Sequence, residues 1–312
     1  MLHDERSFGH IGTLKIMPKL VWFNGELSPL ESATVPAADH AHLYGDGLFE
    51  GIRIYGRRVF KLDEHLRRLY DGCRFLGIPM KWDQESLKRT ILDVCHQSDL
   101  EDGYIRLNVT RGTGLGLDPR AVKTDANVMI MLNTLSLYTP DQFEAGLDVV
   151  TTSFRVIPAD ALDPRLKCIG RYASNIMAKR EANMMNAGEG LMLNHQGMVA
   201  ECTGDNIFIV RDGILRTPHP TAGILQGITR DTVIALAREE GIEVREDFFT
   251  IYDITSADEA FLTGTAAEMI RMRSLDGRII GDGDMGPMTR LLTEKFRAAT
   301  RQGTPVSPVV VS

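Results

Sequence analysis

Two short glycine-containing segments carry residue types that can hold an anion. Gly227, Ile228 and Thr229 open a helical pattern, which leaves backbone N–H groups free at the positive end of a helix. Gly264 and Thr265 directly follow a strand pattern and can add further N–H groups and a hydroxyl. Each feature alone is most often an ordinary cap or strand end. Together they favour a ligand with a phosphate or another anionic group.

Two basic residues are candidates for the same site. Arg53 shares a strand face with Phe49 and Gly51, and Gly51 is expected to leave space for a flat ligand beside Arg53. Lys167 follows Pro164 in an irregular stretch, so it does not lie on a helix face. By residue type alone, a surface arginine and a solvated lysine are the simpler interpretations.

The histidines and cysteines do not indicate a metal site. His40 and His42 form an H-x-H pair that could be half of a metal site, but no third ligand is near, and structural hydrogen bonding is the simpler interpretation. No metal is therefore expected. The cysteines form no C-x-x-C pair and no metal-like spacing with histidine, which predicts free thiols in a reducing cytoplasm. They are Cys73, Cys95, Cys168 and Cys202.

Length and composition limit the class of protein. At roughly 100–200 residues per domain, the 312 residues predict about two domains. Apolar residues make up 43% and charged residues 25%, as in an ordinary globular protein with a sizeable core. The net charge is −7 and there is no basic block, so nucleic acid is not expected as a partner. No secretory signal and no apolar run of about 18 residues is visible, so no membrane association is expected either.

The order of strands and helices predicts an α+β chain in two parts. Residues 1–17 are expected to form a loose arm, and residues 18–137 a small α/β domain. Residues 138–146 contain Thr-Pro, acids and glycine and are the best linker candidate. Residues 147–312 are expected to form the large domain. Because strands and helices do not alternate regularly, a single doubly wound sheet is not expected.

Local patterns predict the individual elements. Asn24-Gly25 and Asp212-Gly213 are hairpin turns, Asp83 is a helix N-cap, and Gly77 ends a helix. The tail from Pro305 could add a strand or hang free. The expected strands are Leu20–Phe23, Leu48–Tyr55, Arg58–Leu62, Tyr104–Thr110, Val128–Leu132, Leu147–Phe154, Asn206–Val210, Ile214–Arg216, Glu259–Leu262 and Met269–Ile280, and the expected helices run from Asp63, from Asp83, over Asn175–Ala187, over Thr229–Glu240 and from Met288.

Five motifs together resemble one known family in their order and spacing. The motifs are Tyr44–Arg53, Lys167 with Tyr172, Glu201–Phe208, Gly227–Asp231 and Thr263–Glu268. With them the chain resembles the class IV, or fold-type IV, aminotransferases that use pyridoxal 5'-phosphate, and within them the branched-chain amino acid group. The resemblance runs from about Val21 to Phe296.

The resemblance implies a role for each residue around the cofactor. Lys167 would carry pyridoxal 5'-phosphate as a Schiff base and then move a proton as a free amine. Glu201 would keep the ring nitrogen protonated, so that the ring works as an electron sink. Tyr172 would donate to the phenolic oxygen. The phosphate would be held by Arg53, by the backbone amides of Ile228 and Thr229 beside Gly227, and by Thr265 beside Gly264.

The same resemblance implies the substrate pocket. Tyr44, Phe49, Tyr104 and Arg106 match positions that line it. The tyrosine corresponding to Tyr104 helps to hold the α-carboxylate, assisted by the amides of Thr265 and Ala266. The arginine corresponding to Arg106 receives the side-chain carboxylate of glutamate. The expected reaction passes the amino group of leucine, isoleucine or valine to 2-oxoglutarate, in a homodimer or higher homo-oligomer with the site near the subunit interface.

Three alternatives remain beside this interpretation. A transaminase of the same fold could act on D-amino acids or (R)-amines, and a lyase of the fold cleaves aminodeoxychorismate. The loop Arg111–Leu117 lacks the Arg-x-His triplet of D-amino acid relatives. A phosphate-ligand binding protein without catalysis is the third alternative. Two residues depart from the family pattern: Arg171 stands where many relatives carry asparagine, and Gln226 where proline is common.

Overall fold

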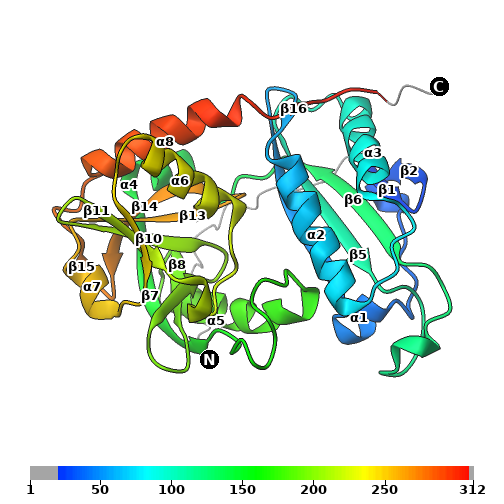
Figure 1. The fold of residues 1–312 in the computed structure, drawn as a ribbon, viewed down its shortest axis with the longest axis horizontal. Helices are drawn as coiled ribbons and strands as arrows, with labels where there is room; N and C mark the ends of the chain where they lie inside the picture. The colour runs from blue at the N-terminus through cyan, green and yellow to red at the C-terminus, as the bar shows by residue number, and fades with distance from the viewer. Residues whose placement is uncertain (1–19, 309–312) are drawn as a thin grey trace, which may run out of the picture.

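The computed structural model describes residues 20–308, which form two β-sheets with helices packed on them (Figure 1). The expected arm, residues 1–17, lies outside the described residues. Strands between residues 20 and 133 build the first sheet, together with one short strand near the C-terminus. Strands between residues 147 and 279 build the second. The chain therefore has the two-part α+β fold that its sequence predicts.

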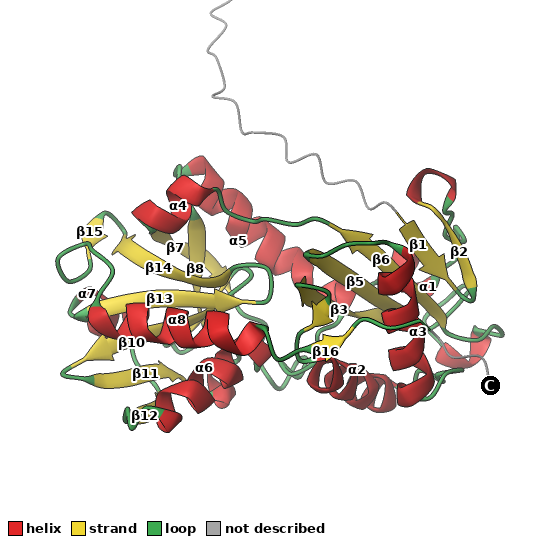
Figure 2. Ribbon diagram, turned by 90° about the horizontal axis from the view of Figure 1, so that it is seen from above, coloured by secondary structure: helices red, strands yellow, loops and turns green. Residues whose placement is uncertain are grey.

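The first sheet has seven strands in the order β16-β4-β3-β5-β6-β1-β2, and every pairing in it is antiparallel. Two long helices, α2 and α3, cover one face of it (Figure 2). The strands are β1 (Leu20–Phe23), β2 (Glu26–Pro29), β3 (Gly47–Tyr55), β4 (Arg58–Val59), β5 (Gly103–Thr110), β6 (Asn127–Asn133) and β16 (Thr304–Pro305), and the helices are α1 (His40–Tyr44), α2 (Leu62–Leu76) and α3 (Gln84–Gln97).

Alternation along the strands separates the core face of this sheet from a second face. In β5, Ile105, Leu107 and Val109 are fully buried, whereas the residues between them are partly exposed. The apolar stripe of α2, with Leu66 and Leu69, packs against the buried residues. The partly exposed face is therefore free to contribute side chains to a site.

The second sheet has nine strands, eight of them in the order β12-β11-β10-β13-β14-β7-β8-β9, with β15 paired to β14. It is mixed, since β7 pairs in parallel with both of its neighbours. Helices α6 and α8 lie side by side along it (Figures 1 and 2). Its strands are β7 (Leu147–Arg155), β8 (Glu189–Leu193), β9 (Val199–Cys202), β10 (Asn206–Arg211), β11 (Ile214–Pro218), β12 (Val244–Asp247), β13 (Glu259–Gly264), β14 (Glu268–Leu275) and β15 (Arg278–Ile279), and its helices are α4 (Pro140–Ala145), α5 (Tyr172–Met184), α6 (Ile228–Glu239), α7 (Ile251–Thr255) and α8 (Pro287–Thr300).

Several elements differ from their predicted form. The expected linker 138–146 contains α4, because Thr139 and Gln142 cap that helix reciprocally, and Tyr138 is buried in the core of the second sheet. Residues 304–305 pair with β4 of the first sheet, although the sequence places the tail in the large domain. We propose that the two sheets mark the two domains, with the C-terminal strand returning to the first.

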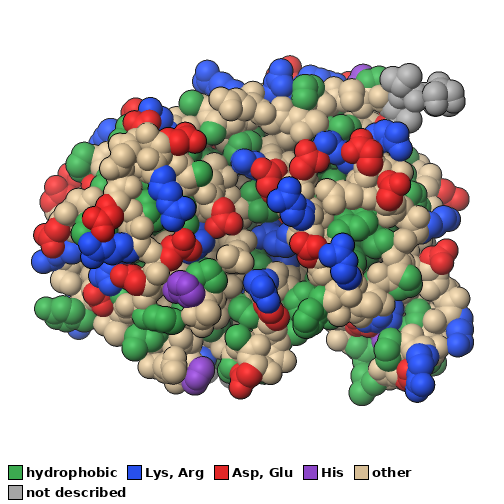
Figure 3. All heavy atoms as spheres, viewed as in Figure 1, with side chains coloured by type: hydrophobic (Ala, Val, Ile, Leu, Met, Phe, Trp, Pro, Cys, Tyr) green, Lys and Arg blue, Asp and Glu red, His purple; other side chains and the backbone are tan. Residues whose placement is uncertain are grey.

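Charge and hydropathy on the described surface fit an ordinary globular chain. On the face shown in Figure 3, basic and acidic side chains are interspersed. Among residues 20–308, no helix is both long and apolar enough to cross a membrane.

Candidate active site

A pocket where the two sheets meet brings together most of the residues that the sequence predicted for the cofactor. Helix α6 supplies its first residues, β9 and β13 supply their C-terminal ends, and the start of α5 closes another side. These segments lie far apart in the chain, so only the fold assembles them. The predicted residues that line the pocket are Lys167, Tyr172, Glu201, Gly227, Ile228, Thr229, Gly264 and Thr265.

The lysine and tyrosine of the pocket are in direct contact. The Nζ atom of Lys167 lies 2.9 Å from the hydroxyl oxygen of Tyr172. The same Nζ lies 4.7 Å from the centre of the Phe49 ring, which packs edge-on against Tyr172. The backbone carbonyl of Lys167 accepts the N–H of Phe49 at 3.0 Å, which ties the irregular segment of Lys167 to β3. Lys167 is thus held at the boundary between the sheets.

Glu201, at the C-terminal end of β9, is the buried acid of the pocket. Its Oε2 accepts the N–H of Leu225 at 2.8 Å and is 3.5 Å from the amide nitrogen of Asn206. Its Oε1 accepts a hydrogen bond of 2.7 Å from Arg171. Burial raises the pKa of Glu201, whereas the Arg171 guanidinium and the Leu225 N–H lower it. Hydrogen bonds therefore orient both oxygens of the carboxylate, and the Arg171 charge opposes the effect of burial on its pKa.

The start of α6 has the features of an anion site. Gly227 is the N-cap, with no side-chain cap, so the first N–H groups of the helix have no partner from that residue. A Cβ on Gly227 would lie 2.1 Å from Oδ1 of Asn206, so a larger residue here would have to displace the Asn206 side chain. Thr263, in the adjacent β13, lines the same pocket, and its buried hydroxyl has no hydrogen-bond partner among the described residues.

The predicted substrate residues of β3 and β5 lie on the partly exposed face of the first sheet. The guanidinium carbon of Arg106 lies 3.5 Å from the centre of the Phe49 ring, and Nε of Arg106 donates to Asn108 at 2.9 Å. Tyr104 extends over Gly51, where a Cβ would lie 2.1 Å from its hydroxyl. The expectation that Gly51 leaves space for a flat ligand is therefore wrong, because Tyr104 occupies that space.

Tyr44 lies at the end of α1 and not in a strand of this sheet. Its hydroxyl accepts the N–H of Gly116 at 3.0 Å, and 42% of the residue is exposed. His40 binds Asp46 at 2.7 Å and the carbonyl of Gly116 at 3.0 Å. The first histidine of the H-x-H pair thus has the structural hydrogen-bonding role that we expected. Between residues 20 and 308, no cluster of ligand side chains could hold a metal ion.

Comparison with known proteins identifies the family to which this geometry belongs. Residues 47–275 match the model of the amino-transferase class IV family. A putative branched-chain-amino-acid aminotransferase of Methanocaldococcus jannaschii is 44% identical over 278 residues, which cover 89% of this chain and 95% of that protein. The chain belongs to the class IV aminotransferases, in the branched-chain amino acid aminotransferase family.

Solved structures of branched-chain aminotransferases share the fold of this chain. The crystal structure of the Escherichia coli enzyme superimposes with a TM-score of 0.87 at 35% identity and covers 90% of this chain and 94% of that chain. The crystal structure of the T.th. branched-chain amino acid aminotransferase complexed with N-(5'-phosphopyridoxyl)-L-glutamate has a TM-score of 0.85 at 34% identity, and covers 92% of this chain and 96% of that chain.

Class IV aminotransferases depend on pyridoxal 5'-phosphate, and the pocket fits that group. An amine, a buried carboxylate and an N–H-lined helix start are the three chemical partners that an aldehyde, a basic ring nitrogen and a phosphate require. The hydroxyl of Thr263 has no partner among the described residues and can donate a further hydrogen bond to the cofactor. The cofactor assignment therefore agrees with the donor set of the pocket.

Arg53 is the one predicted cofactor residue of this aminotransferase that lies outside the pocket. It donates to the carbonyl of Leu135 at 3.1 Å and pairs with Glu268 at 3.3 Å. Arg68 of α2 lies in the pocket instead and donates to the carbonyl of Gln226 at 2.8 Å, directly before α6. The position of Arg53 does not fit the phosphate role, and that of Arg68 does.

A signal for Arg68 was present in the sequence. Glu50 stands in an apolar strand, and a carboxylate buried there requires a cation. Arg68 and His65, three residues apart on one face of α2, both bind Glu50. Burial alone would raise the pKa of Glu50, but the Arg68 guanidinium lowers it to about 2. The buried Glu50 of β3 therefore indicates a cation nearby, and Arg68 of α2 is that cation.

Asp205 is a second buried acid that the sequence did not single out. It lines the pocket, and the hydroxyl of Tyr138 donates to it at 3.2 Å. Burial, together with the nearby Glu189 carboxylate, raises the pKa of Asp205 to about 7. Gly264 makes room for this side chain, since a Cβ there would lie 2.1 Å from Oδ1 of Asp205.

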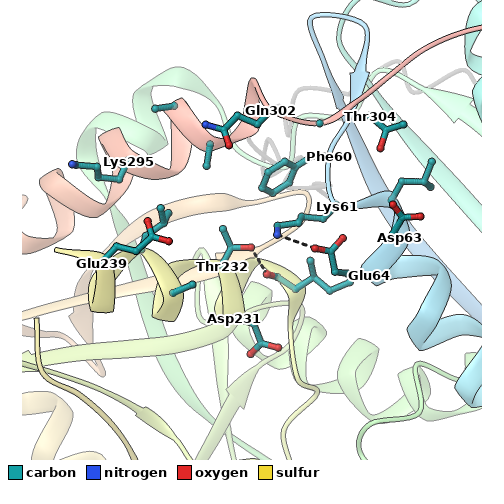
Figure 4. Close-up of a pocket in the computed structure, with 17 residues that line it drawn as sticks. Phe60, Lys61, Asp63, Glu64, Asp231, Thr232, Glu239, Lys295, Gln302 and Thr304 are labelled. Atoms are coloured by element: carbon teal, nitrogen blue, oxygen red, sulfur yellow. Dashed lines mark hydrogen bonds and ion pairs between the residues drawn. The ribbon is translucent and has the colours of Figure 1, made fainter. Parts of the chain in front are cut away.

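A second, larger cavity of about 680 Å³ is also lined by residues of α6 (Figure 4). It is bordered by the beginning of α2, by α6 and by α8, and it contains Ile228 but neither Lys167 nor Glu201. Its charges have both signs, and Lys61 pairs with Glu64 at 2.8 Å. Size alone therefore does not identify the active site of this aminotransferase.

Proposed function

We propose that this chain is a transaminase that moves the amino group of leucine, isoleucine or valine to 2-oxoglutarate, with pyridoxal 5'-phosphate bound to the amine of Lys167. Relatives named branched-chain-amino-acid aminotransferase support it, including one from Escherichia coli that is 35% identical over 281 residues. The observation that carries the proposal is that Lys167, Tyr172 and Glu201 line one pocket beside Phe49 and Arg106.

On the cofactor side, each residue has one task. When bound, the cofactor accepts the electron pair left by the Cα proton of the amino acid. The freed amine of Lys167 would take that proton from Cα as a general base and deliver it to C4′ of the cofactor. The Tyr172 hydroxyl, 2.9 Å from Nζ of Lys167, donates to the phenolic oxygen. Glu201 holds a proton on the ring nitrogen.

On the phosphate side, the start of α6 and Arg68 act together. The N–H groups of Ile228 and Thr229 and the hydroxyl of Thr265 donate to the phosphate. Arg68 adds the fixed positive charge that the family resemblance assigns to Arg53. Because Arg68 is also bound to Glu50 and Gln226, its guanidinium is preorganised before the phosphate arrives.

On the substrate side, two groups of residues divide the work. The Tyr104 hydroxyl and the amides of Thr265 and Ala266 bind the α-carboxylate. Phe49 provides an apolar wall for a branched side chain, and Arg106, stacked on that ring, binds the second carboxylate of glutamate. The glutamate adduct of the T.th. enzyme supports glutamate as one of the paired substrates.

Borohydride reduction tests the assignment of Lys167. Reduction of the yellow holoprotein, followed by peptide mapping, is expected to place the cofactor on Lys167. Lys167→Ala is expected to fold and bind cofactor without transferring an amino group. Normal exchange in this variant, or a cofactor fixed to another lysine, would contradict the assignment.

Separate half-reactions test the substrate class. Mixing the holoprotein with L-leucine, L-valine, L-glutamate, D-alanine or an (R)-amine, and following the cofactor absorbance, distinguishes the branched-chain reaction from its rivals of the same fold. Fast conversion by the L-amino acids alone is the expected result. Faster conversion by D-alanine or the amine, or pyruvate release from aminodeoxychorismate, would favour a rival.

We further propose a homodimer in the cytoplasm. The loop after β5 exposes Leu115 and Leu117 by 72% and 81%, and α5 exposes Ile176 by 66%, which supports an interface that covers them. The four cysteines are buried free thiols, as a reducing compartment favours. Sedimentation equilibrium of the holoprotein is expected to give twice the chain mass, and a monomer would contradict the dimer.

A further inference from the structure

Arg171 is an almost fully buried arginine directly beside Glu201. Only 3% of it is exposed. Its Nη2 donates to Oε1 of Glu201 at 2.7 Å and lies 3.4 Å from the carbonyl oxygen of Gly223. Its Nη1 donates to the carbonyl oxygen of Pro164. These partners hold the guanidinium in a fixed, desolvated ion pair with Glu201. Removal of either charge would therefore leave the other buried without compensation.

These bonds connect three segments that contribute residues to the cofactor pocket. Pro164 lies three residues before Lys167 in the same irregular loop. Gly223 lies two residues before Leu225, whose N–H binds the other oxygen of Glu201 at 2.8 Å. Arg171 itself directly precedes Tyr172 and caps α5. One side chain therefore ties the lysine loop to the acid and to the loop that orients the acid.

The charge of Arg171 is as important as its bonds. Glu201 is 5% exposed, and burial favours its neutral form. The charged groups that oppose burial are Arg171 and, more weakly, Lys167. Lys167 is committed to the cofactor in the proposed function, so Arg171 is the cation that stays dedicated to Glu201. A neutral Glu201 could not hold a proton on a ring nitrogen.

We propose that Arg171 is a positioning residue that keeps the carboxylate of Glu201 ionised and aimed at the ring nitrogen of the cofactor. The inference rests on the proposed function, in which Glu201 faces that nitrogen. Arg171 does not touch the cofactor; it acts through Glu201. Its removal is therefore expected to change the protonation of the ring, and not only the stability of the fold.

The direct test is the ¹⁵N chemical shift of cofactor labelled at the ring nitrogen and bound to the holoprotein, followed over pH. In the unmodified protein the ring nitrogen is expected to stay protonated near neutral pH. Arg171→Met is expected to lower the proton affinity of that nitrogen by at least about tenfold, a shift of about one unit in its pKa. Arg171→Lys, which keeps the charge, is expected to restore most of the protonation.

Two controls separate charge from packing. Arg271→Met removes another buried guanidinium, which binds the carbonyls of Glu144, Ala145 and Gly283 away from the pocket. It is expected to lower the melting temperature without changing the ¹⁵N shift. If Arg171→Met does not fold, Arg171→Gln replaces it, because glutamine can still donate to the Pro164 carbonyl but carries no charge.

The outcomes distinguish this inference from the proposed function beneath it. Glu201→Gln should also deprotonate the ring nitrogen if Glu201 faces it. A deprotonated ring in Glu201→Gln with an unchanged ring in both neutral Arg171 variants would overturn the role of Arg171 alone. An unchanged ring in Glu201→Gln would instead overturn the assignment of Glu201, and the role of Arg171 with it. Loss of the ring proton in both Arg171→Met and Glu201→Gln supports the inference.

Discussion

Arg68 holds the carboxylate of Glu50 with two hydrogen bonds of 2.7 Å each, one from Nε and one from Nη2. This bidentate pair crosses from α2 to β3 and leaves Nη1 to reach the carbonyl of Gln226 at 2.8 Å. Glu50 is fully buried, so the pair is rigid and little screened by solvent. Glu50, in a strand of the first sheet, thus fixes the Arg68 cation beside the start of α6, in a pocket that belongs mainly to the second sheet.

This relationship predicts different consequences for the two arginines. Arg68→Met should weaken binding of pyridoxal 5'-phosphate by about 10- to 100-fold, the scale of a lost charge-assisted hydrogen bond. Arg53→Met should leave that affinity within about threefold, because Arg53 binds Leu135 and Glu268 outside the pocket. Equilibrium dialysis of cofactor against each apoprotein measures both constants.

The melting temperature of each apoprotein is the control for this comparison. Arg68→Met also leaves Glu50 buried without its main partner, so some loss of stability is expected. Arg68→Lys keeps a charge near both groups and should show an intermediate affinity. A larger loss of cofactor affinity in Arg53→Met than in Arg68→Met would contradict this prediction and assign the phosphate contact to Arg53, as the family resemblance implies.

The Glu50 carboxylate also predicts how stability depends on pH. Burial would raise its pKa, but Arg68 and then His65 bring it down from 4.5 to about 2. A carboxyl group whose pKa is lower in the folded state stabilises the fold above its unfolded pKa, and that stability is lost as pH falls toward the folded value. The difference corresponds to roughly 3 kcal/mol at most.

Urea unfolding of the apoprotein at several pH values measures this contribution. The free energy of unfolding should fall between about pH 5 and pH 3 in the unmodified protein and fall less in Glu50→Gln. Glu50→Gln should already be less stable near neutral pH. Burial lowers the pKa of His65, so His65 adds a loss in the same direction at higher pH. Parallel curves for the two proteins below about pH 5 would show that Glu50 is not the titrating group.

Gly51 tests whether Tyr104 must extend across β3. Its missing Cβ leaves the space that the tyrosine uses, since a Cβ would lie 2.1 Å from the hydroxyl and 2.8 Å from Cζ. Gly51→Ala should therefore displace Tyr104 and raise the KM for leucine and glutamate together, by about tenfold, because both share the α-carboxylate contact. Steady-state kinetics with both substrates, beside Tyr104→Phe, measure this effect. An unchanged KM in Gly51→Ala would show that Tyr104 does not bind the α-carboxylate.

Local patterns in the sequence predicted those parts of the fold whose signals are local. The turn at Asn24-Gly25, the cap at Asp83 and the end of α2 at Gly77 lie where they were expected, since each depends on a few neighbouring residues. The strand β8 was missed, because all five of its residues are buried and no alternation marks them. Helix α5 begins at Tyr172, three residues before the predicted start.

The site shows the same division between local and long-range information. Resemblance to a family placed Lys167, Glu201 and the start of α6 in one pocket, as the structure has them. It assigned the phosphate to Arg53 and did not single out Arg68, because the place of Arg68 depends on how α2 packs against β3. The bond from Arg171 to Glu201 spans 30 positions of the chain and appears only once β9 and the loop before α5 are folded.

Arg106 is predicted to serve the acidic substrate and not the branched one. One pocket must accept both a leucine side chain and the second carboxylate of glutamate, and a buried carboxylate without a partner is costly. The structure places the guanidinium carbon of Arg106 over the Phe49 ring, at 3.5 Å from the ring centre, with Asn108 as its hydrogen-bond partner at 2.9 Å. It has no carboxylate partner among the described residues, so donors remain for a ligand.

Arg106→Leu should therefore weaken the half-reaction with glutamate by ~2–3 kcal/mol, the scale of a lost charge-assisted contact. The half-reaction with leucine should change far less, since Phe49 would keep an apolar neighbour. Single-turnover absorbance measurements with each amino acid separate the two effects, and Arg106→Lys should recover part of the glutamate rate. Equal losses for leucine and glutamate would mean that Arg106 supports Phe49 or the α-carboxylate contact, because only a contact specific to the second carboxylate distinguishes the two substrates.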